Sequence, residues 1–291
     1  IEYYEKSANL NDSYALLKLG YFHEVGQGVQ QDYSKAIKYY EKSANLGNSN
    51  ALHYLGFIYE KGKGVKQDIS KAIKYYEKSA NLNSSYAIYR LGFLYDEGKG
   101  VKQDISKAIK YYEKSANLDN SFALHNLGIL YDEGNKVQQN YIKAIEYYEK
   151  SANLENSHSM YRLGVIYKNE HYQNKDYSKA KEYFEKSADL NNSQALNSLG
   201  SLYESGLGVE LNYIKAFEYY KKSAKLNNSE AFLKIGNFYF NGYGVNINYR
   251  KAIQCYEISS NLNNSIAHFI LGDIFSNNDI IELNLNKAIM Y

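Results

Sequence analysis

The stretch Leu55-Gly56-Phe57-Ile58-Tyr59-Glu60-Lys61-Gly62-Lys63-Gly64-Val65 returns along the whole of this 291-residue chain. The glycine at its second position recurs every 36 residues, at Gly20, Gly56, Gly92, Gly128, Gly164, Gly200, Gly236 and Gly272. Ser49, just before the stretch, and Ala72, just after it, keep the same interval. A fixed period of this length is typical of a solenoid, in which stacked repeats bury the apolar faces that a single repeat cannot bury alone.

The first half of each repeat has the pattern of an amphipathic helix. Within residues 50–61, apolar side chains recur at i, i+1, i+4, i+7 and i+8, which places them on one helix face and excludes a strand. We predict that the Ser49 hydroxyl caps the start of this helix. Gly62 is expected to end it, because glycine readily takes the left-handed conformation that follows helices. Gly56 lies inside the helix, where glycine costs about 1 kcal/mol relative to alanine, so its recurrence predicts a close approach by another helix.

The second half of each repeat predicts a second helix, at about residues 69–82. Asp68 stands at its start, and aspartate or asparagine holds the equivalent place in every repeat, as expected of an N-cap. Val65 is apolar within a polar loop, and we expect it to fill the space between the two helices. The predicted fold is all-α: a right-handed α-α superhelical solenoid of 36-residue helix-turn-helix repeats, with the first helices inside and the second helices outside.

The period also predicts the domain organisation, a single solenoid over the whole chain. We expect a partial repeat at 1–12, seven complete repeats at 13–264 and a partial, degenerate repeat at 265–291, and the complete repeats are numbered 1 to 7 below. Residues 1–8 match residues 37–44, in the middle of a second helix. The chain is therefore expected to be a fragment of a longer protein.

Charge and composition limit the classes of partner. A net charge of +2, from 34 basic and 32 acidic residues, gives no reason to expect a nucleic acid. Lysines of the second helices, such as Lys71 and Lys74, alternate with glutamates such as Glu77, which favours a solvated face. The single cysteine, Cys255, favours a small buried side chain and provides no disulfide framework. A cytoplasmic location is therefore favoured, although the compartment is unknown, and no apolar run approaches the roughly 20 residues that span a membrane.

With these residues in place, the chain resembles the Sel-one-like repeat (SLR) family, a branch of the tetratricopeptide-repeat superfamily. The family pattern reads approximately A-x-x-x-L-G-x-x-Y-x-x-G-x-G-V-x-x-D-x-x-K-A-x-x-Y-Y-x-K-A-A. It is filled by Ala51, Leu55, Gly56, Tyr59, Gly62, Gly64, Val65, Asp68, Lys71, Ala72, Tyr75, Tyr76, Lys78 and Ala80. The regular departure is Ser79, where the family often has alanine. The resemblance implies a scaffold or adaptor that holds partner proteins in complexes, and it implies no catalysis.

One stripe of the first helices lies beside the core-facing residues, at positions equivalent to Asn50, His53, Phe57 and Glu60. If the family geometry holds, this stripe lines the concave groove, and in repeats 1 to 4 it combines aromatic side chains with an acidic end. The predicted partner is a protein or peptide segment with apolar and basic residues. The predicted groove residues are Tyr14, Tyr21, His53, Phe57, Glu60, Tyr86, Tyr89, Phe93, Asp96, Phe122, His125 and Asp132.

A second interpretation of the stripe stays open. The aromatic side chains would then pack only against each other between adjacent first helices, and the chain would be a structural spacer between fused domains with no partner of its own. Two loops also depart from the pattern, since Asn135 and Lys136 follow the single loop glycine of repeat 4 and residues 168–175 of repeat 5 lack both glycines. Sequence drift and a contact role are both compatible with these loops.

Catalysis and cofactor binding find no support in the residue pattern. His53 and His125 hold equivalent positions two repeats apart, which is about 20 Å at a helix packing distance of about 10 Å and too far for a shared metal ion. The sequence has no nucleophile elbow, no phosphate-binding loop and no H-E-x-x-H zinc-binding motif. We therefore predict no enzyme, no metal site and no cofactor in this span.

Overall fold

The computed structural model describes residues 1–170 and 172–276, and these form sixteen helices and no strand. The first helices of successive repeats are α2 (Ser13–Val25), α4 (Ser49–Lys61), α6 (Ser85–Glu97), α8 (Ser121–Glu133), α10 (Ser157–Lys168), α12 (Ser193–Ser205), α14 (Ser229–Asn241) and α16 (Ser265–Ser276). The second helices are α1 (Glu2–Asn9), α3 (Tyr33–Asn45), α5 (Ile69–Asn81), α7 (Ile105–Ala116), α9 (Tyr141–Asn153), α11 (Tyr177–Asp189), α13 (Tyr213–Lys225) and α15 (Tyr249–Asn261). The prediction of an all-α solenoid of 36-residue helix pairs is confirmed.

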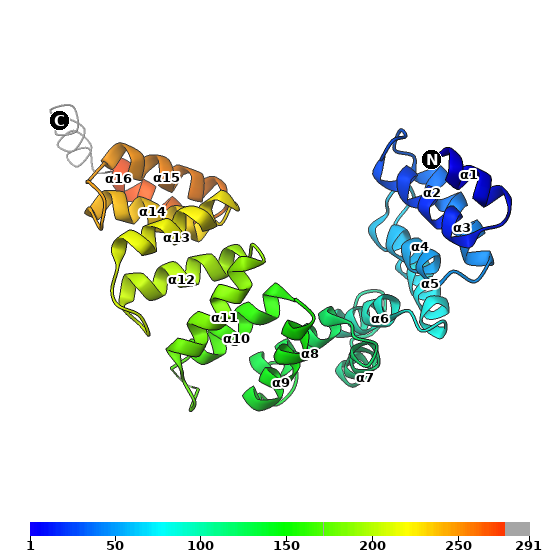
Figure 1. The fold of residues 1–291 in the computed structure, drawn as a ribbon, viewed down its shortest axis with the longest axis horizontal. Helices are drawn as coiled ribbons and strands as arrows, with labels where there is room; N and C mark the ends of the chain where they lie inside the picture. The colour runs from blue at the N-terminus through cyan, green and yellow to red at the C-terminus, as the bar shows by residue number, and fades with distance from the viewer. Residues whose placement is uncertain (171, 277–291) are drawn as a thin grey trace. The chain divides into compact units, whose positions relative to one another are not determined.

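The chain divides into two compact bodies, Ile1–Leu154 and Glu155–Tyr291, called here the N-terminal and C-terminal bodies. Within each body every helix packs against the next one in the chain, and the two helices of one repeat pack most closely (Figure 1). The second half of the partial repeat expected at 265–291 lies outside the described residues. The right-handed course and the single solenoid over the whole chain stay predictions.

The N-cap predicted for the first helix is displaced by one residue. Asn48, and not Ser49, has the extended backbone of a cap, and its side-chain oxygen accepts hydrogen bonds from the backbone N–H groups of Asn50 (3.1 Å) and Ala51 (3.3 Å). Asparagine has a carbonyl oxygen on a longer arm than the serine hydroxyl, and it reaches two free N–H groups at once. The cap predicted for the second helix is confirmed, because Asp68 accepts from the Lys71 N–H at 2.8 Å.

The serine that replaces the family's alanine joins the two helices of a repeat. The buried Ser79 hydroxyl donates a hydrogen bond to the backbone carbonyl of Ser49 at 2.7 Å. Equivalent bonds form in every complete repeat, from Ser43, Ser115, Ser151, Ser187, Ser223 and Ser259. Because a buried hydroxyl without a partner costs free energy, this bond explains why serine is retained at a fully buried position.

The glycine inside the first helix contacts an aromatic ring. A Cβ atom added to Gly56 would lie 2.6 Å from the Tyr76 ring, which is fully buried. The close approach predicted from the sequence is therefore confirmed, and the element that approaches is a tyrosine of the second helix. The helix end predicted at Gly62 is confirmed, because Gly62 has a left-handed φ of 68°. Val65 packs against a core cluster formed by residues of α2, α3 and α4.

Replacing the glycine that ends a first helix should destabilise the chain. Gly98 has φ 66°, and alanine in this conformation costs about 1–2 kcal/mol, so Gly98→Ala should lower the free energy of unfolding by about that amount. Gly47 provides a matched control, because it is also left-handed (φ 81°), has open space around it, and has asparagine at the equivalent Asn83. Gly47→Asn should leave the thermal midpoint nearly unchanged. Equal midpoints for both variants would contradict this account.

Candidate functional site

The rings in the middle of the predicted stripe pack between repeats. The Tyr89 ring is half-buried, and its centroid lies 5.9 Å from those of both Tyr112 and Phe122. The His53 ring is placed in the same way, 5.7 Å from Tyr76 and 6.0 Å from Tyr86. Each of these rings thus joins a buried tyrosine of its own repeat to the first stripe residue of the next. The packing interpretation left open above applies to these two positions.

The rings at the start of the stripe keep much of their surface open to solvent. Tyr14 is 65% exposed, Tyr86 is 53% exposed and Phe122 is 49% exposed, while Tyr21 further along α2 is 38% exposed. Two of them rest on rings of the preceding repeat, Tyr86 on His53 and Phe122 on Tyr89. Exposed aromatic surface that is held in place from below is the kind of surface that partner proteins contact.

Two further stripe rings form cation–π contacts with lysine or arginine side chains of this chain. Lys63 lies 4.8 Å from the centroid of the Phe57 ring, and the Arg90 guanidinium lies 4.7 Å from that of Phe93. Lys99 approaches Phe93 as well, at 5.0 Å. These cation–π contacts occupy ring surface that a basic residue of a partner would otherwise use.

The acidic end of the stripe is bound within the chain. Glu60 is only 4% exposed, and its carboxylate accepts hydrogen bonds from the Tyr76 hydroxyl (2.9 Å) and from Nε (3.1 Å) and Nη2 of Arg90 in the next repeat. Burial acts to raise the pKa of Glu60, but the bonds and charge of Arg90 and the bond from Tyr76 outweigh it and hold the pKa below its usual value. Glu60 therefore joins two repeats instead of lying open in a groove.

Glu24 repeats this geometry, and Asp132 shares the bond to a second-helix tyrosine. The buried Glu24 carboxylate accepts from the Tyr40 hydroxyl at 2.8 Å and forms an ion pair with Lys63 of the next repeat at 3.6 Å. Asp132 accepts from the Tyr148 hydroxyl at 3.2 Å and is half-buried. A shared arrangement of an acidic residue, a second-helix tyrosine and a basic residue of the following repeat is called a rung below.

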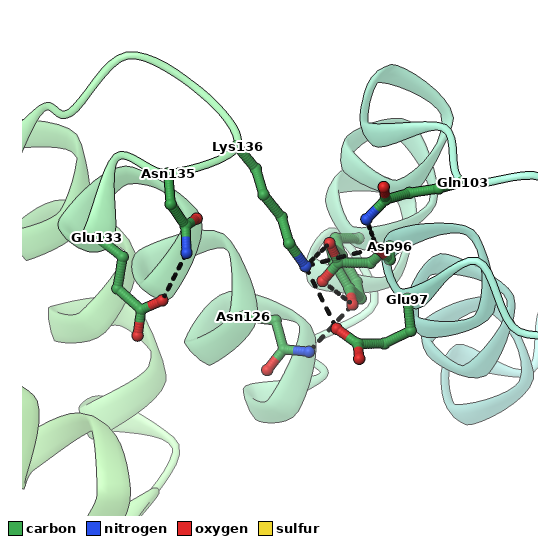
Figure 2. Close-up of polar contacts among 8 residues, drawn as sticks. Asp96, Glu97, Gln103, Asn126, Glu133, Asn135 and Lys136 are labelled. Carbon is green, nitrogen blue, oxygen red and sulfur yellow. Dashed lines mark hydrogen bonds and ion pairs between the residues drawn. The ribbon is translucent and has the colours of Figure 1, made fainter.

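The rung at Asp96 takes its cation from an irregular loop. Figure 2 shows Lys136 extending from the loop after α8 to the end of α6, where Nζ lies 2.7 Å from Asp96 Oδ1 and 3.2 Å from Glu97 Oε1. Asp96 is 7% exposed and also accepts from the Tyr112 hydroxyl at 3.2 Å. Lys136 stands where other loops have their second glycine, so in repeat 4 the lost glycine is replaced by an ion pair between repeats.

The described histidines and Cys255 are not grouped into a site with each other. Burial, helped by the charge of Arg90, lowers the pKa of His53 to about 4, so its imidazole is neutral at neutral pH. Cys255 is half-buried, and burial raises the pKa of its thiol. In residues 1–170 and 172–276, no three His, Cys, Asp or Glu side chains are grouped to hold a metal ion.

Hollows recur on the other side of the repeats, around the ends of the second helices. One of about 590 Å³ is lined by Leu16, Leu19, Tyr39 and Lys42, among others. Equivalent hollows lie around Glu113 (about 510 Å³) and Glu185 (about 580 Å³). Their recurrence at equivalent positions shows that they arise from stacking of the repeats.

The match to known proteins covers nearly the whole chain. The Sel1 repeat profile matches residues 1–12, 13–48, 49–84, 85–120, 121–156, 157–192, 193–228 and 229–264. The chain belongs to the Sel1 repeat family. Sel1 repeat proteins generally mediate protein–protein interactions, and they are generally non-catalytic scaffolds. None of the described helices combines the length and the apolar character needed to cross a membrane.

Two solved structures are similar over most of this Sel1 repeat chain. The crystal structure of c5321, a protective antigen present in uropathogenic Escherichia coli strains and displaying an SLR fold, is 27% identical over 95% of the chain, with a TM-score of 0.78. The chain spans 59% of the length of c5321. A Sel1 repeat protein from Oxalobacter formigenes is 28% identical, with a TM-score of 0.77, over 84% of this chain and 99% of its own length. No curated protein sequence matches the chain.

The rungs were not predicted from the sequence, although a signal for them exists. In this chain the tyrosine follows the acidic residue by 16 positions, as Tyr76 follows Glu60, and a cation can stand 30 positions after the acidic residue, as Arg90 does. The same spacing holds in the C-terminal body, where Glu204 accepts from the Tyr220 hydroxyl at 2.5 Å and from Lys234 at 3.1 Å. Comparing these positions between repeats would have indicated paired acidic residues.

Proposed function

We propose that this chain is a non-enzymatic scaffold whose first-helix stripe in the N-terminal body binds an extended segment of a partner protein. The observation that carries this proposal is the row of half-exposed rings, with Tyr86 and Phe122 held at equivalent positions of successive repeats by the rings beneath them. Rigid aromatic side chains offer large contact area at little cost in conformational entropy. The near-neutral charge favours a protein over a nucleic acid.

The proposed surface retains the residues predicted from the sequence but gives them different roles. Tyr14, Tyr86, Phe122 and Tyr21 would contact the partner directly, because they have the most exposed ring surface. The surrounding members are His53, Phe57, Tyr89, Phe93 and His125, and the acidic members are Glu60, Asp96 and Asp132. A basic partner residue at Glu60 or Asp96 would have to displace Arg90 or Lys136, so we expect apolar side chains to dominate recognition.

Alanine substitution of the two exposed rings tests the proposal. Random-sequence peptides displayed on phage are selected on the full chain, and the dissociation constants of the selected peptides are measured by fluorescence polarisation. Tyr86→Ala and Phe122→Ala should each weaken binding by about 2 kcal/mol, or roughly 30-fold, as for aromatic hot spots. Both side chains are about half exposed, so the thermal midpoint should change little.

An exposed apolar residue outside the stripe provides the control. Ile142 on α9 is 69% exposed, and Ile142→Ala should leave the dissociation constants unchanged. If the Tyr86 and Phe122 variants bind the selected peptides as tightly as the unaltered chain, the stripe is not the binding surface. The spacer interpretation predicts a different pattern. No selected peptide would bind the stripe, and alanine substitution of inward rings such as Tyr89 would lower the thermal stability.

A further inference from the structure

Repeat 5 contains a rung whose charge is inverted. The three rung positions, held by Glu60, Tyr76 and Arg90 in repeats 2 and 3, are held here by Lys168, Phe184 and Ser198. Phe184 is fully buried at the tyrosine position and has no hydroxyl to donate. All three members of the rung have therefore changed together, and a cation replaces the acidic residue.

Lys168 has no internal counter-ion. The rungs at Glu24, Glu60, Asp96 and Glu204 each bring a lysine or arginine to the carboxylate. Lys168 is half-buried at the end of α10, and no carboxylate of the described residues lies within ion-pair distance of its ammonium group. Burial lowers the pKa of Lys168, and the positive charge of Lys234 lowers it further. A partly buried charge of this kind is costly unless another group compensates it.

The next first helix, α12, carries polar side chains on its stripe. On α12, the three stripe positions that are aromatic in repeat 3 are held by Gln194, Asn197 and Ser201. The stripe of α12 is therefore polar where that of α6 is aromatic.

The balance of charge indicates which group fits. Lys168 and Lys234 supply two positive charges, and Glu204, which is paired with Lys234, supplies one negative charge. We infer that Lys168, beside α12, binds the carboxylate of an aspartate or glutamate side chain in a partner protein. This inference rests on the proposed scaffold function and adds an acidic requirement to the partner. A carboxylate carries the single negative charge that neutralises the cluster, whereas a phosphate would exceed it.

Direct observation of the lysine tests this assignment. The lysines of the full chain are reductively methylated with ¹³C-formaldehyde, which keeps their charge, and the Lys168 signal is assigned with Lys168→Arg. Titration with acetyl-Glu-amide should shift the Lys168 signal to saturation in the millimolar range, while exposed Lys186 should show no saturation. The uncharged acetyl-Gln-amide should leave the Lys168 signal in place.

Two outcomes would overturn the inference. If the Lys168 shift does not saturate, or matches that of Lys186, the ammonium group is simply solvated and no site exists. If acetyl-phosphoserine-amide binds more tightly than acetyl-Glu-amide, the site prefers a phosphorylated segment and the carboxylate assignment is wrong. The Lys168 signal reports on the C-terminal body alone. If peptide binding proves not to depend on Tyr86 and Phe122, the stripe proposal fails, but the result of the Lys168 titration is unaffected.

Discussion

Arg90→Met is expected to lower the free energy of unfolding by about 3 kcal/mol, because it leaves the buried Glu60 carboxylate with only the more exposed Lys61 as a cation, at 3.4 Å. Methionine keeps much of the apolar stem of arginine, so the loss reports the charge and hydrogen bonds and not the packing. The measurement is chemical denaturation followed by circular dichroism. The Tyr76 hydroxyl and Lys61 still contact Glu60, but a neutral donor and a half-exposed ammonium group do not replace the two charge-assisted hydrogen bonds of Arg90.

Two control variants separate the ion pair from other effects. Replacing both partners, Glu60→Gln with Arg90→Met, should cost clearly less than Arg90→Met alone, since no buried charge then stays unpaired. Lys234→Met breaks the equivalent rung at Glu204, where both side chains are more exposed, and should cost only about 1 kcal/mol. If the double variant is no more stable than Arg90→Met, the arginine does not act through Glu60.

The same rung determines the response to acid. The folded-state pKa of Glu60 lies below its unfolded value, which is about 4.3, so the stabilisation is complete above that pH and is lost as the pH falls toward the folded-state pKa. Glu60→Gln has no such group to protonate. The unaltered chain should therefore lose more stability than Glu60→Gln between about pH 5 and pH 3, and parallel curves would contradict the depressed pKa.

The helix pair, its loop and its second cap could be predicted because each depends on residues close in sequence. Gly62 ends a helix and Asp68 begins one through contacts with their immediate neighbours. The first cap is harder to predict, because Asn48 and Ser49 are both good capping residues and stand side by side. The sequence alone did not show that the Ser49 carbonyl is used by the Ser79 hydroxyl 30 residues later.

The direction of the stripe side chains could be predicted, but their partners could not. Helical spacing placed Glu60 and Asp96 on the stripe face, and it carries no information on what a neighbouring repeat brings to that face. Arg90 and Lys136 reach these carboxylates from 30 and 40 residues away, one from a helix and one from an irregular loop. The predicted basic partner of these acidic residues is, for Glu60 and Asp96, already part of the chain.

Gly92→Ala should also be strongly destabilising, by about 2 kcal/mol. The added Cβ would lie 2.7 Å from Cδ1 of the Tyr112 ring and 3.3 Å from the Ala108 carbonyl oxygen. Tyr112 is fully buried and its hydroxyl is bound to Asp96, so the ring has little freedom to move away. Alanine gains about 1 kcal/mol in helix propensity, but overpacking of about 1–3 kcal/mol opposes this gain, and the rigid surroundings favour the upper part of that range.

A double-mutant cycle with Tyr112→Leu tests whether the ring is the cause. Leucine is smaller than the tyrosine ring, so in that background the new Cβ should find space and Gly92→Ala should cost at least about 1 kcal/mol less than it does alone. Once the clash is removed, helix propensity favours alanine, and the sign of the effect can reverse. Thermal and denaturant midpoints of the two single variants and the double variant supply the coupling energy. Equal costs of Gly92→Ala in both backgrounds would show that the glycine is needed for a reason other than contact with the tyrosine.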